Sequence, residues 1–309
     1  GATMKKIAVA DKIDKVDSTL ISDDDLDASH NVLNYDDVIA LKYKERFDKK
    51  IEVKAKRNAM IFVIKGSKTF GEKSKIVLNE NEILFVKSGS FKAINAISKA
   101  DGIYKSYCIF FSNMFLLKFL SKHKYLLDLI ASRAKISVYK IQSDIYINEQ
   151  INSLSVYFDN KDKLNTNVFK EIIKLKTEAL FLLLMNREDR VFSSFVHSIL
   201  ASQPFLRILL DNSDKEFGSV KEMANIFDTN ISLFSKKFKT NFGISPKEWL
   251  DNEKFEKAKL LIEFSNKNVT EVCKELKINS VAWFIERFKE RYGTTPKQLQ
   301  KSHNLYFGK

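Results

Sequence analysis

The sequence predicts an α+β protein of two domains, with strands concentrated near the N-terminus and helices alone at the C-terminus. Two observations lead to this fold class. Short apolar runs separated by turn residues follow one another between about residues 38 and 111. A 16-residue motif then occurs twice near the C-terminus, as FSKKFKTNFGISPKEW at 234–249 and FIERFKERYGTTPKQL at 284–299. A spacing of 50 residues is typical of a duplicated supersecondary unit.

The composition is that of an ordinary globular protein with a strong positive charge. The chain of 309 residues has 44% hydrophobic and 29% charged residues and a net charge of +13. This length suffices for two cores, and the charge favours a polyanionic partner. Residues 201–309 carry a net charge of only +5, so the charge alone does not locate a binding surface. Gly1–Thr3 precede Met4 as an expression scar would.

The location predicted from these features is the cytoplasm. The longest apolar run, Ala179–Met185, is too short to span a bilayer, so no membrane association is expected. No signal peptide is visible at the N-terminus. The two cysteines, Cys108 and Cys273, are far apart in the sequence and are interpreted as reduced thiols.

Residues 1–30 are predicted to form a polar arm. Residues 4–30 are rich in charge, with an acidic cluster at Asp23, Asp24, Asp25 and Asp27. The cluster lacks the glycine and the final glutamate of an EF-hand loop. A solvated arm is therefore favoured over a calcium site.

Residues 31–185 are predicted to form a β-barrel or jelly-roll of the cupin kind, followed by helices. Turn signals stand at 65–66, 79–81 and 88–89, between six predicted strands: Ile51–Val53, Met60–Ile64, Ile76–Leu78, Ile83–Val86, Phe91–Ile97 and Tyr104–Phe111. No histidine lies among these strands, so no metal and no cofactor is predicted. The basic residues of 42–75 either form a solvated surface, which is favoured, or hold an anionic carboxylate. Effector-binding residues stay unassigned.

Helices are predicted from 113 to 185. Ser112 caps the first, and Thr166 or Asn167 opens another that becomes apolar on nearly all sides at Phe181–Met185. That end is either core or a helix–helix dimer surface. Residues 186–195 are interpreted as a linker, and residues 196–302 as a helical domain that opens with a helix at Pro204–Asn212.

Each copy of the repeated motif is predicted to form a helix-turn-helix followed by a further helix. In the first copy, Ser219 with Glu222 opens a helix, Asn230 caps the second, Gly243 ends it, and Ser245-Pro246 starts the third. The second copy repeats these signals at Asn268 with Glu271, at Asn279 or Ser280, at Gly293 and at Thr295-Pro296. In DNA-binding helix-turn-helix motifs, the second helix of each copy lies in the major groove.

Residues 219–300 resemble the DNA-binding domain of AraC/XylS-type bacterial transcription regulators. The resemblance rests on the helix of Ala224, on A-x-x-L-I at 258–262, and on the runs F-K-x-x-F-G-x-S-P at 238–246 and F-K-x-x-Y-G-x-T-P at 288–296. The chain departs from the family at Lys254, Cys273 and Lys277-Ile278, where Arg, Ala and Gly-Phe are usual. The run EILFVKSGS at 82–90 is similar to the N-terminal domains of AraC-type regulators of virulence and type III secretion genes.

The resemblance implies a sequence-specific regulator, an activator working with RNA polymerase, whose N-terminal domain binds a small-molecule effector or a regulatory protein and mediates homodimerisation. Double-stranded promoter DNA is the expected partner. The alternative is an interaction protein that sequesters partners and has lost specific DNA binding. Motifs of common enzymes, such as G-x-x-x-x-G-K-[ST] and G-x-S-x-G, are absent, so no catalytic residues are predicted.

Helical periodicity selects the candidate DNA contacts. Phe234 and Phe238 form the predicted buried side of the second helix in the first copy, with Ile231 and Phe242 beside them. The opposite face offers the predicted contacts Ser232, Ser235, Lys236 and Lys239. The second copy offers Ala282, Glu286, Lys289 and Arg291. Because Glu286 stands where the first copy has Lys236, the first copy is expected to carry most of the base reading.

Overall fold

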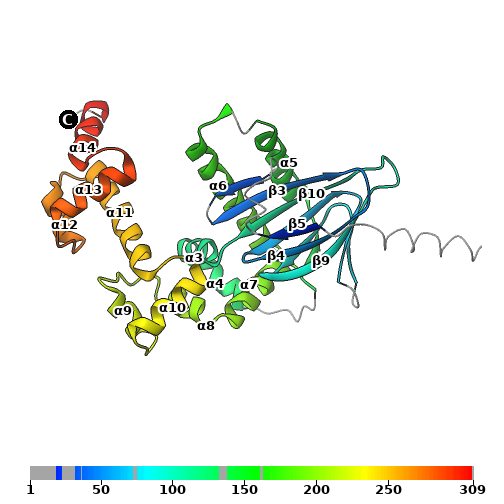
Figure 1. Ribbon diagram of the computed structural model, residues 1–309, viewed down its shortest axis with the longest axis horizontal. Coiled ribbons are helices and arrows are strands. Elements are labelled where there is room, and N and C mark those ends of the chain that lie inside the picture. The colour runs from blue at the N-terminus through cyan, green and yellow to red at the C-terminus, as the bar shows by residue number, and fades with distance from the viewer. Residues whose placement is uncertain are drawn as a thin grey trace, which may run out of the picture. The chain divides into compact units, whose positions relative to one another are not determined.

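A computed structural model places the chain in two compact units, Gly1–Asp211 and Asn212–Lys309 (Figure 1). The structure describes residues 19–22, 32–35, 37–71, 75–131, 138–160 and 163–307. The predicted α+β class is confirmed, with all described strands in the first unit and helices alone in the second. The acidic cluster at 23–27 lies outside the described residues.

Two sheets form the β part of the first unit. The five-stranded sheet has the order β1 (Thr19–Ser22), β4 (Lys49–Ala55), β9 (Gly89–Ala96), β6 (Ser67–Phe70) and β7 (Ile76–Leu78). The six-stranded sheet has the order β11 (Lys140–Gln142), β8 (Glu82–Val86), β5 (Asn58–Lys65), β10 (Tyr104–Phe111), β3 (Val38–Glu45) and β2 (Val32–Tyr35). Neighbouring strands are antiparallel, except that β1 runs parallel to β4.

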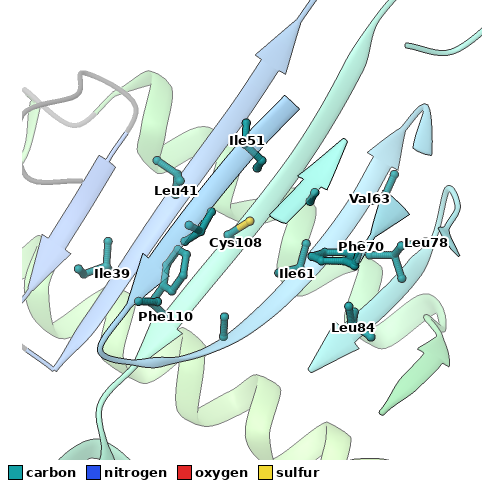
Figure 2. Close-up of a cluster of buried hydrophobic side chains, with 14 of the residues drawn as sticks. Ile39, Leu41, Ile51, Ile61, Val63, Phe70, Leu78, Leu84, Cys108 and Phe110 are labelled. Atoms are coloured by element: carbon teal, nitrogen blue, oxygen red, sulfur yellow. The ribbon is translucent and has the colours of Figure 1, made fainter. Parts of the chain in front are cut away.

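The space between the sheets is filled by alternate side chains of the strands (Figure 2). On β10, Cys108 and Phe110 join this core, while Tyr107 and Phe111 point to the other face of the six-stranded sheet. This alternation follows from the two-residue period of a strand. Because both faces of β10 are buried, its sequence is apolar at nearly every position and carries no alternating pattern.

Helices cover the second face of the six-stranded sheet. Aromatic pairs join them to the strands, as in Tyr107 with Phe158 at 5.8 Å and Phe111 with Phe181 at 4.9 Å between ring centroids. The helices are α3 (Asn113–Lys122), a short 3₁₀ turn η1 (Lys124–Leu126), α4 (Leu127–Ala131), α5 (Ile145–Asp159), α6 (Thr166–Met185), α7 (Val191–Ser202) and α8 (Pro204–Asp211). Ser112 caps α3 as expected, accepting from the Phe115 amide at 3.0 Å.

The structure differs from the expected linker at 186–195. Residues 191–202 form helix α7, in which Phe192 and Phe195 are fully buried and contact Phe85 of β8. Helix α8 also belongs to the first unit, where it packs against α3. The division between the units therefore falls at 211–212. The run NREDR that suggested a linker is only the short turn between α6 and α7.

Part of the expected polar arm is a strand, because Thr19–Ser22 pairs with Ile51–Lys54 of β4. Strands β2, β3, β6 and β11 also lie outside the predicted set of six. No helix in the part of the chain that the structure describes has the length and apolar content needed to cross a membrane.

The second unit contains six helices in the described residues. They are α9 (Val220–Asn225), α10 (Ile231–Phe242), α11 (Pro246–Phe264), α12 (Val269–Glu275), α13 (Val281–Tyr292) and α14 (Pro296–Phe307). Helix α11 lies between the two copies of the motif and packs against helices of both, namely α9, α10, α12 and α14.

Candidate nucleic-acid interface

The two copies of the motif form two helix-turn-helix modules with the expected caps. Asn230 accepts from the Leu233 amide at 2.8 Å and starts α10, and Ser280 accepts from the Trp283 amide at 3.2 Å and starts α13. Gly243 and Gly293 end these helices in the left-handed conformation, with φ of 78° and 73°. Glycine adopts this conformation without the steric cost of a Cβ atom. The start and end of both second helices therefore agree with the sequence prediction.

The buried faces of α10 and α13 carry matching phenylalanines. Phe234, Phe238, Phe284 and Phe288 are all 0% exposed. In the second module, Phe284 stacks on Phe255 of α11 at 5.3 Å between centroids. In the first, Phe238 meets Trp249 of α11 at 6.0 Å. This packing fixes which face of each helix is left outward.

The outward face of α10 contains all four residues predicted for the first copy. Ser232, Lys236 and Lys239 are exposed and Ser235 is half-buried. They recur at intervals of three and four residues, so they share one stripe along the helix. Neither lysine forms a salt bridge within the described residues. Helix α10 has three lysines and no acidic residue, so this surface is purely cationic.

One expectation about α10 is wrong: Ile231 is not part of the buried stripe. Its side chain is 47% exposed, and that of Leu233 is 44% exposed. Trp283, at the position of α13 that corresponds to Leu233, is 37% exposed while its ring contacts Phe255 at 5.7 Å. The two modules thus present a large apolar side chain at the same place beside the polar stripe. The sequence signal for it was the shared offset of 50, which joins Leu233 to Trp283.

In the second module, the predicted residues divide into two groups. Ala282, Glu286 and Lys289 are exposed along one stripe of α13. Arg291 instead turns toward α11, where its Nη1 donates to Asn252 Oδ1 at 2.5 Å and its Nη2 lies 3.2 Å from Glu256 Oε1. The structure therefore separates Arg291 from the other three.

A small network around Glu256 holds the end of α13 against α11. The hydroxyl of Tyr292 donates to Glu256 Oε1 at 3.1 Å, and the Arg291 guanidinium lies over the Phe255 ring at 5.8 Å. Burial, with the charge of Glu256, raises the pKa of Tyr292 to about 12, so its hydroxyl stays protonated as a donor. Arg287 is also engaged, pairing with Glu290 at 2.7 Å. Among the described residues, Lys289 is left as the cation of α13 without an ion pair.

The turns of the two modules differ by one residue. A residue at positive φ follows the end of each first helix, Asp228 at 48° after α9 and Lys277 at 53° after α12. The next amide bonds back to a carbonyl five residues earlier, from Thr229 to Ala224 and from Ile278 to Cys273. The first module then reaches its cap at Asn230, but the second inserts Asn279 before Ser280. Lys277 thus adopts a left-handed conformation at the position where glycine is usual in the family.

Comparison with known families now places both units. The family model of the ExsA N-terminal regulatory domain matches residues 58–195, and that of the helix-turn-helix domain matches residues 223–302. The chain belongs to the AraC/XylS family of transcription regulators. The first match ends within α7, which agrees with the inclusion of that helix in the first unit.

Two of the curated proteins similar to this AraC-type regulator come from Yersinia species. The virulence regulon transcriptional activator VirF of Yersinia enterocolitica is 23% identical over 231 residues, which cover 72% of this chain and 81% of the relative. The thermoregulatory protein LcrF of Yersinia pestis is 24% identical over 132 residues, covering 42% of this chain and 48% of that protein. Among solved structures, ToxT from Vibrio cholerae is similar at 14% identity and a TM-score of 0.38, over 85% of this chain and 98% of that one.

Proposed function

We propose that α10 and α13 enter successive major grooves on one face of duplex DNA. The observation that carries this proposal is the mounting of both second helices on the single helix α11. Its 19 residues span about 28 Å at 1.5 Å per residue. This is close to the roughly 34 Å of one DNA turn. One chain can thereby reach two adjacent groove segments.

The first module is proposed to carry the base reading. Ser232, Ser235 and Lys236 face outward from the first half of α10, the half that approaches base edges in a helix-turn-helix. Serine hydroxyls and lysine ammonium groups can donate to the acceptors of guanine and adenine. Leu233 adds an exposed apolar surface beside them, which suits the methyl group of thymine. Lys239, one turn further along, is assigned to phosphate.

The second module is proposed to grip the backbone and to read bases weakly. Glu286 repels phosphate, although its carboxylate can accept from cytosine N4. Lys289 is the cation available for phosphate, while Arg287 and Arg291 are paired with carboxylates inside the unit. Arg291 is accordingly assigned to the contact between α13 and α11, with phosphate as its alternative partner in the complex.

The first unit is proposed to control this binding through a small-molecule effector or a regulatory protein. The match of this unit to a regulatory domain and the name of the activator VirF support this proposal. We expect the protein to act in the cytoplasm and to recruit RNA polymerase to promoters. No catalytic role is assigned to any residue. The chemical class of the effector is the property expected to distinguish this chain from other members of the family.

A homodimer through helix α6 is part of the proposal. Val168, Ile172, Leu175, Ala179 and Leu182 recur at alternating intervals of four and three, which is the spacing of a coiled-coil seam. Val168 and Leu175 are 49% and 59% exposed, and the other three are part-buried. The fully apolar end at Phe181–Met185 is different: Phe181, Leu184 and Met185 are 0% exposed inside the unit.

Selection of binding sites from random duplex DNA at near-physiological salt tests the proposal. The full-length chain and a fragment of residues 212–309 are compared. An enriched site with two blocks about one turn apart is expected, with the stronger block under the first module. Enrichment from the fragment alone would mean that the first unit represses binding until its effector arrives.

The rival function is that of an interaction protein without specific DNA binding. It predicts steep salt dependence with no preference among sequences, because phosphate contacts alone give affinity but not specificity. Failure of both the full-length chain and the fragment to enrich any site would establish the rival and reject the proposal.

A further inference from the structure

A lysine lies buried between the two sheets of the first unit. Lys68 on β6 is 1% exposed, and within the described residues its Nζ donates a hydrogen bond to Asn95 Oδ1 of β9 alone, at 2.8 Å. The two residues are direct cross-strand partners in the five-stranded sheet. No carboxylate reaches the ammonium among the described residues, so its charge is not neutralised by the protein.

Aromatic rings from both sheets surround this ammonium. Its nitrogen lies 5.6 Å from the ring centroids of Tyr43 and Phe70 and 5.9 Å from that of Tyr104. Ring faces attract a cation, but less strongly than an anion does. Burial disfavours the charged form of Lys68 and lowers its pKa to about 8.

Further buried polar atoms lie in the same space. Within the described residues Asn95 Nδ2 has no hydrogen-bond partner, and the hydroxyls of Tyr104 and Ser106 have none beyond their interaction with each other. All three side chains are 0% exposed. Tyr104 and Ser106 lie on β10 of the six-stranded sheet, where Ser106 stands opposite Tyr43 of β3. Because the rings of Tyr43 and Tyr104 lie near the Lys68 ammonium, this sheet faces Lys68 and Asn95 of the five-stranded sheet here. Buried polar groups are nearly always satisfied, so an unpaired amide and two hydroxyls with unused hydrogen-bonding capacity around one ammonium call for a ligand.

The chemistry of that ligand follows from what the cluster offers. Lysine ammonium, amide nitrogen and two hydroxyls can all donate hydrogen bonds, and none of them carries a negative charge. The remaining surroundings are aliphatic and aromatic, including Ile51, Val53 and Val63. We propose that Lys68, Asn95, Tyr104 and Ser106 form an internal site for the oxyanion of a small organic carboxylate. Inorganic phosphate shares the oxyanion chemistry but leaves the apolar walls without a partner.

Tyr43 is the natural entrance to this site. Of the three aromatic rings around the Lys68 ammonium, that of Tyr43 is partly exposed, whereas those of Phe70 and Tyr104 are buried. Rotation of its side chain would open a path from solvent to the Lys68 ammonium. The proposal deepens the proposed function, since it names the effector class for the first unit and rests on that function only for its effect on DNA binding.

Thermal unfolding of the full-length chain with simple probes tests the site. Benzoate and hexanoate are compared with benzyl alcohol and hexanol, which keep the apolar body and lack the charge, and with sodium phosphate. At saturation a carboxylate is expected to raise Tm by about 5 °C, as a ligand at 100 times its Kd does. The alcohols are expected to leave Tm unchanged.

Variants separate binding at Lys68 from general anion effects. Lys68→Met should lose the response while its own Tm stays at or above that of the parent chain, because an apolar side chain replaces a buried charge. The matched control Lys118→Met removes an exposed lysine of α3 and should keep the response. Tyr104→Phe should weaken the affinity for benzoate about tenfold, the loss of one hydrogen bond.

Three results would overturn the inference: no probe raises Tm, the alcohols raise it equally, or Lys68→Met still responds. A phosphate response that Lys68→Met abolishes would support the oxyanion site and assign it to an inorganic ion. If Lys68→Met does not fold, an unchanged benzoate affinity in Tyr104→Phe rejects the site. Recovery of an operator by selection without any probe response would reject this inference and leave the proposed function standing.

Discussion

Lys277 shows how one side chain departs from the residue that its conformation prefers. It adopts φ of 53° in the turn after α12, a backbone region in which a Cβ atom meets the following carbonyl. Asp228 occupies the same place in the first module at 48°, but aspartate tolerates this region better. The second turn is therefore the more strained of the two.

Substitution Lys277→Gly is expected to stabilise the second unit by about 1 kcal/mol, the cost of a left-handed non-glycine residue. Denaturant unfolding followed by tryptophan fluorescence measures this in the whole chain, because both tryptophans, Trp249 and Trp283, lie in the second unit. Asp228→Gly should gain less. Lys274→Gly, placed inside α12, should instead lose about 1 kcal/mol.

Lys236, Lys239 and Arg291 are expected to differ in their effects on the affinity of DNA binding and on its salt dependence. Lys236→Ala should weaken binding to the selected site by about 1–3 kcal/mol if the lysine reads a base. Lys239→Ala should reduce the slope of log K against log salt by about 0.9, as one lost phosphate contact does. Arg291→Ala should lower stability through loss of the Asn252 and Glu256 contacts and leave that slope unchanged. A reduced slope in Arg291→Ala would return this residue to the phosphate contacts.

At the scale of elements, helix α6 has two apolar faces with different uses. One packs on the six-stranded sheet through Phe181, which contacts Phe111, Phe115, Phe119 and Phe192. The other is the half-exposed stripe from Val168 to Leu182. Packing this stripe against the same stripe of a second chain would remove the apolar surface of both chains from water, as in a two-fold dimer.

Leu175→Glu is expected to convert a dimer of the full-length chain to a monomer, since a charge would be buried in the seam. Sedimentation equilibrium measures the change. Leu260→Glu is the matched control, because Leu260 of α11 is 57% exposed and Leu175 is 59% exposed. A parent chain that is already monomeric, or equal dissociation of both variants, would contradict the α6 interface.

The sequence predicted the helical unit well because its signals are local. Caps such as Ser219, Asn230 and Asn268 act on amides three residues away, and Gly243 and Gly293 mark ends within one turn. Helix α7 was missed because its burial depends on Phe85 of β8, more than 100 residues earlier. Ile231 was wrongly predicted to be buried, because helical periodicity identifies the buried face of a helix but not the residue at which burial stops. Arg291 shows the same limit, since its partners on α11 are set by tertiary packing.

At the scale of the whole molecule, the position of the division between units decides which fragments can exist alone. Residues 191–211 form α7 and α8, whose apolar side chains Phe192, Ile199 and Leu206 are buried in the first unit. A boundary at 195 would leave most of these side chains on the second fragment without their partners. The second unit has its own core around Phe255, Phe284 and Phe288.

Residues 212–309 are expected to form a monomeric, cooperatively unfolding fragment, whereas residues 196–309 should aggregate. The physical reason is the exposed apolar surface of α7 and α8 in the longer fragment. Size-exclusion chromatography and thermal unfolding of both fragments measure the difference. A longer fragment that is the more soluble of the two would place α7 and α8 with the second unit.

Helix α11 supplies side chains to both modules: Trp249 near its start meets Phe238 of the first, and Phe255, Ala258 and Ile262 further along pack in the core of the second. The duplication visible in the sequence has therefore not produced two separable parts. Substitutions could accumulate on the outward face of α13 during evolution until this helix no longer contacted any base. The second copy could not be lost, because the bare side of α11 would then face water. The persistence of that copy is explained by folding alone, and it need not be taken as evidence of selection for sequence reading.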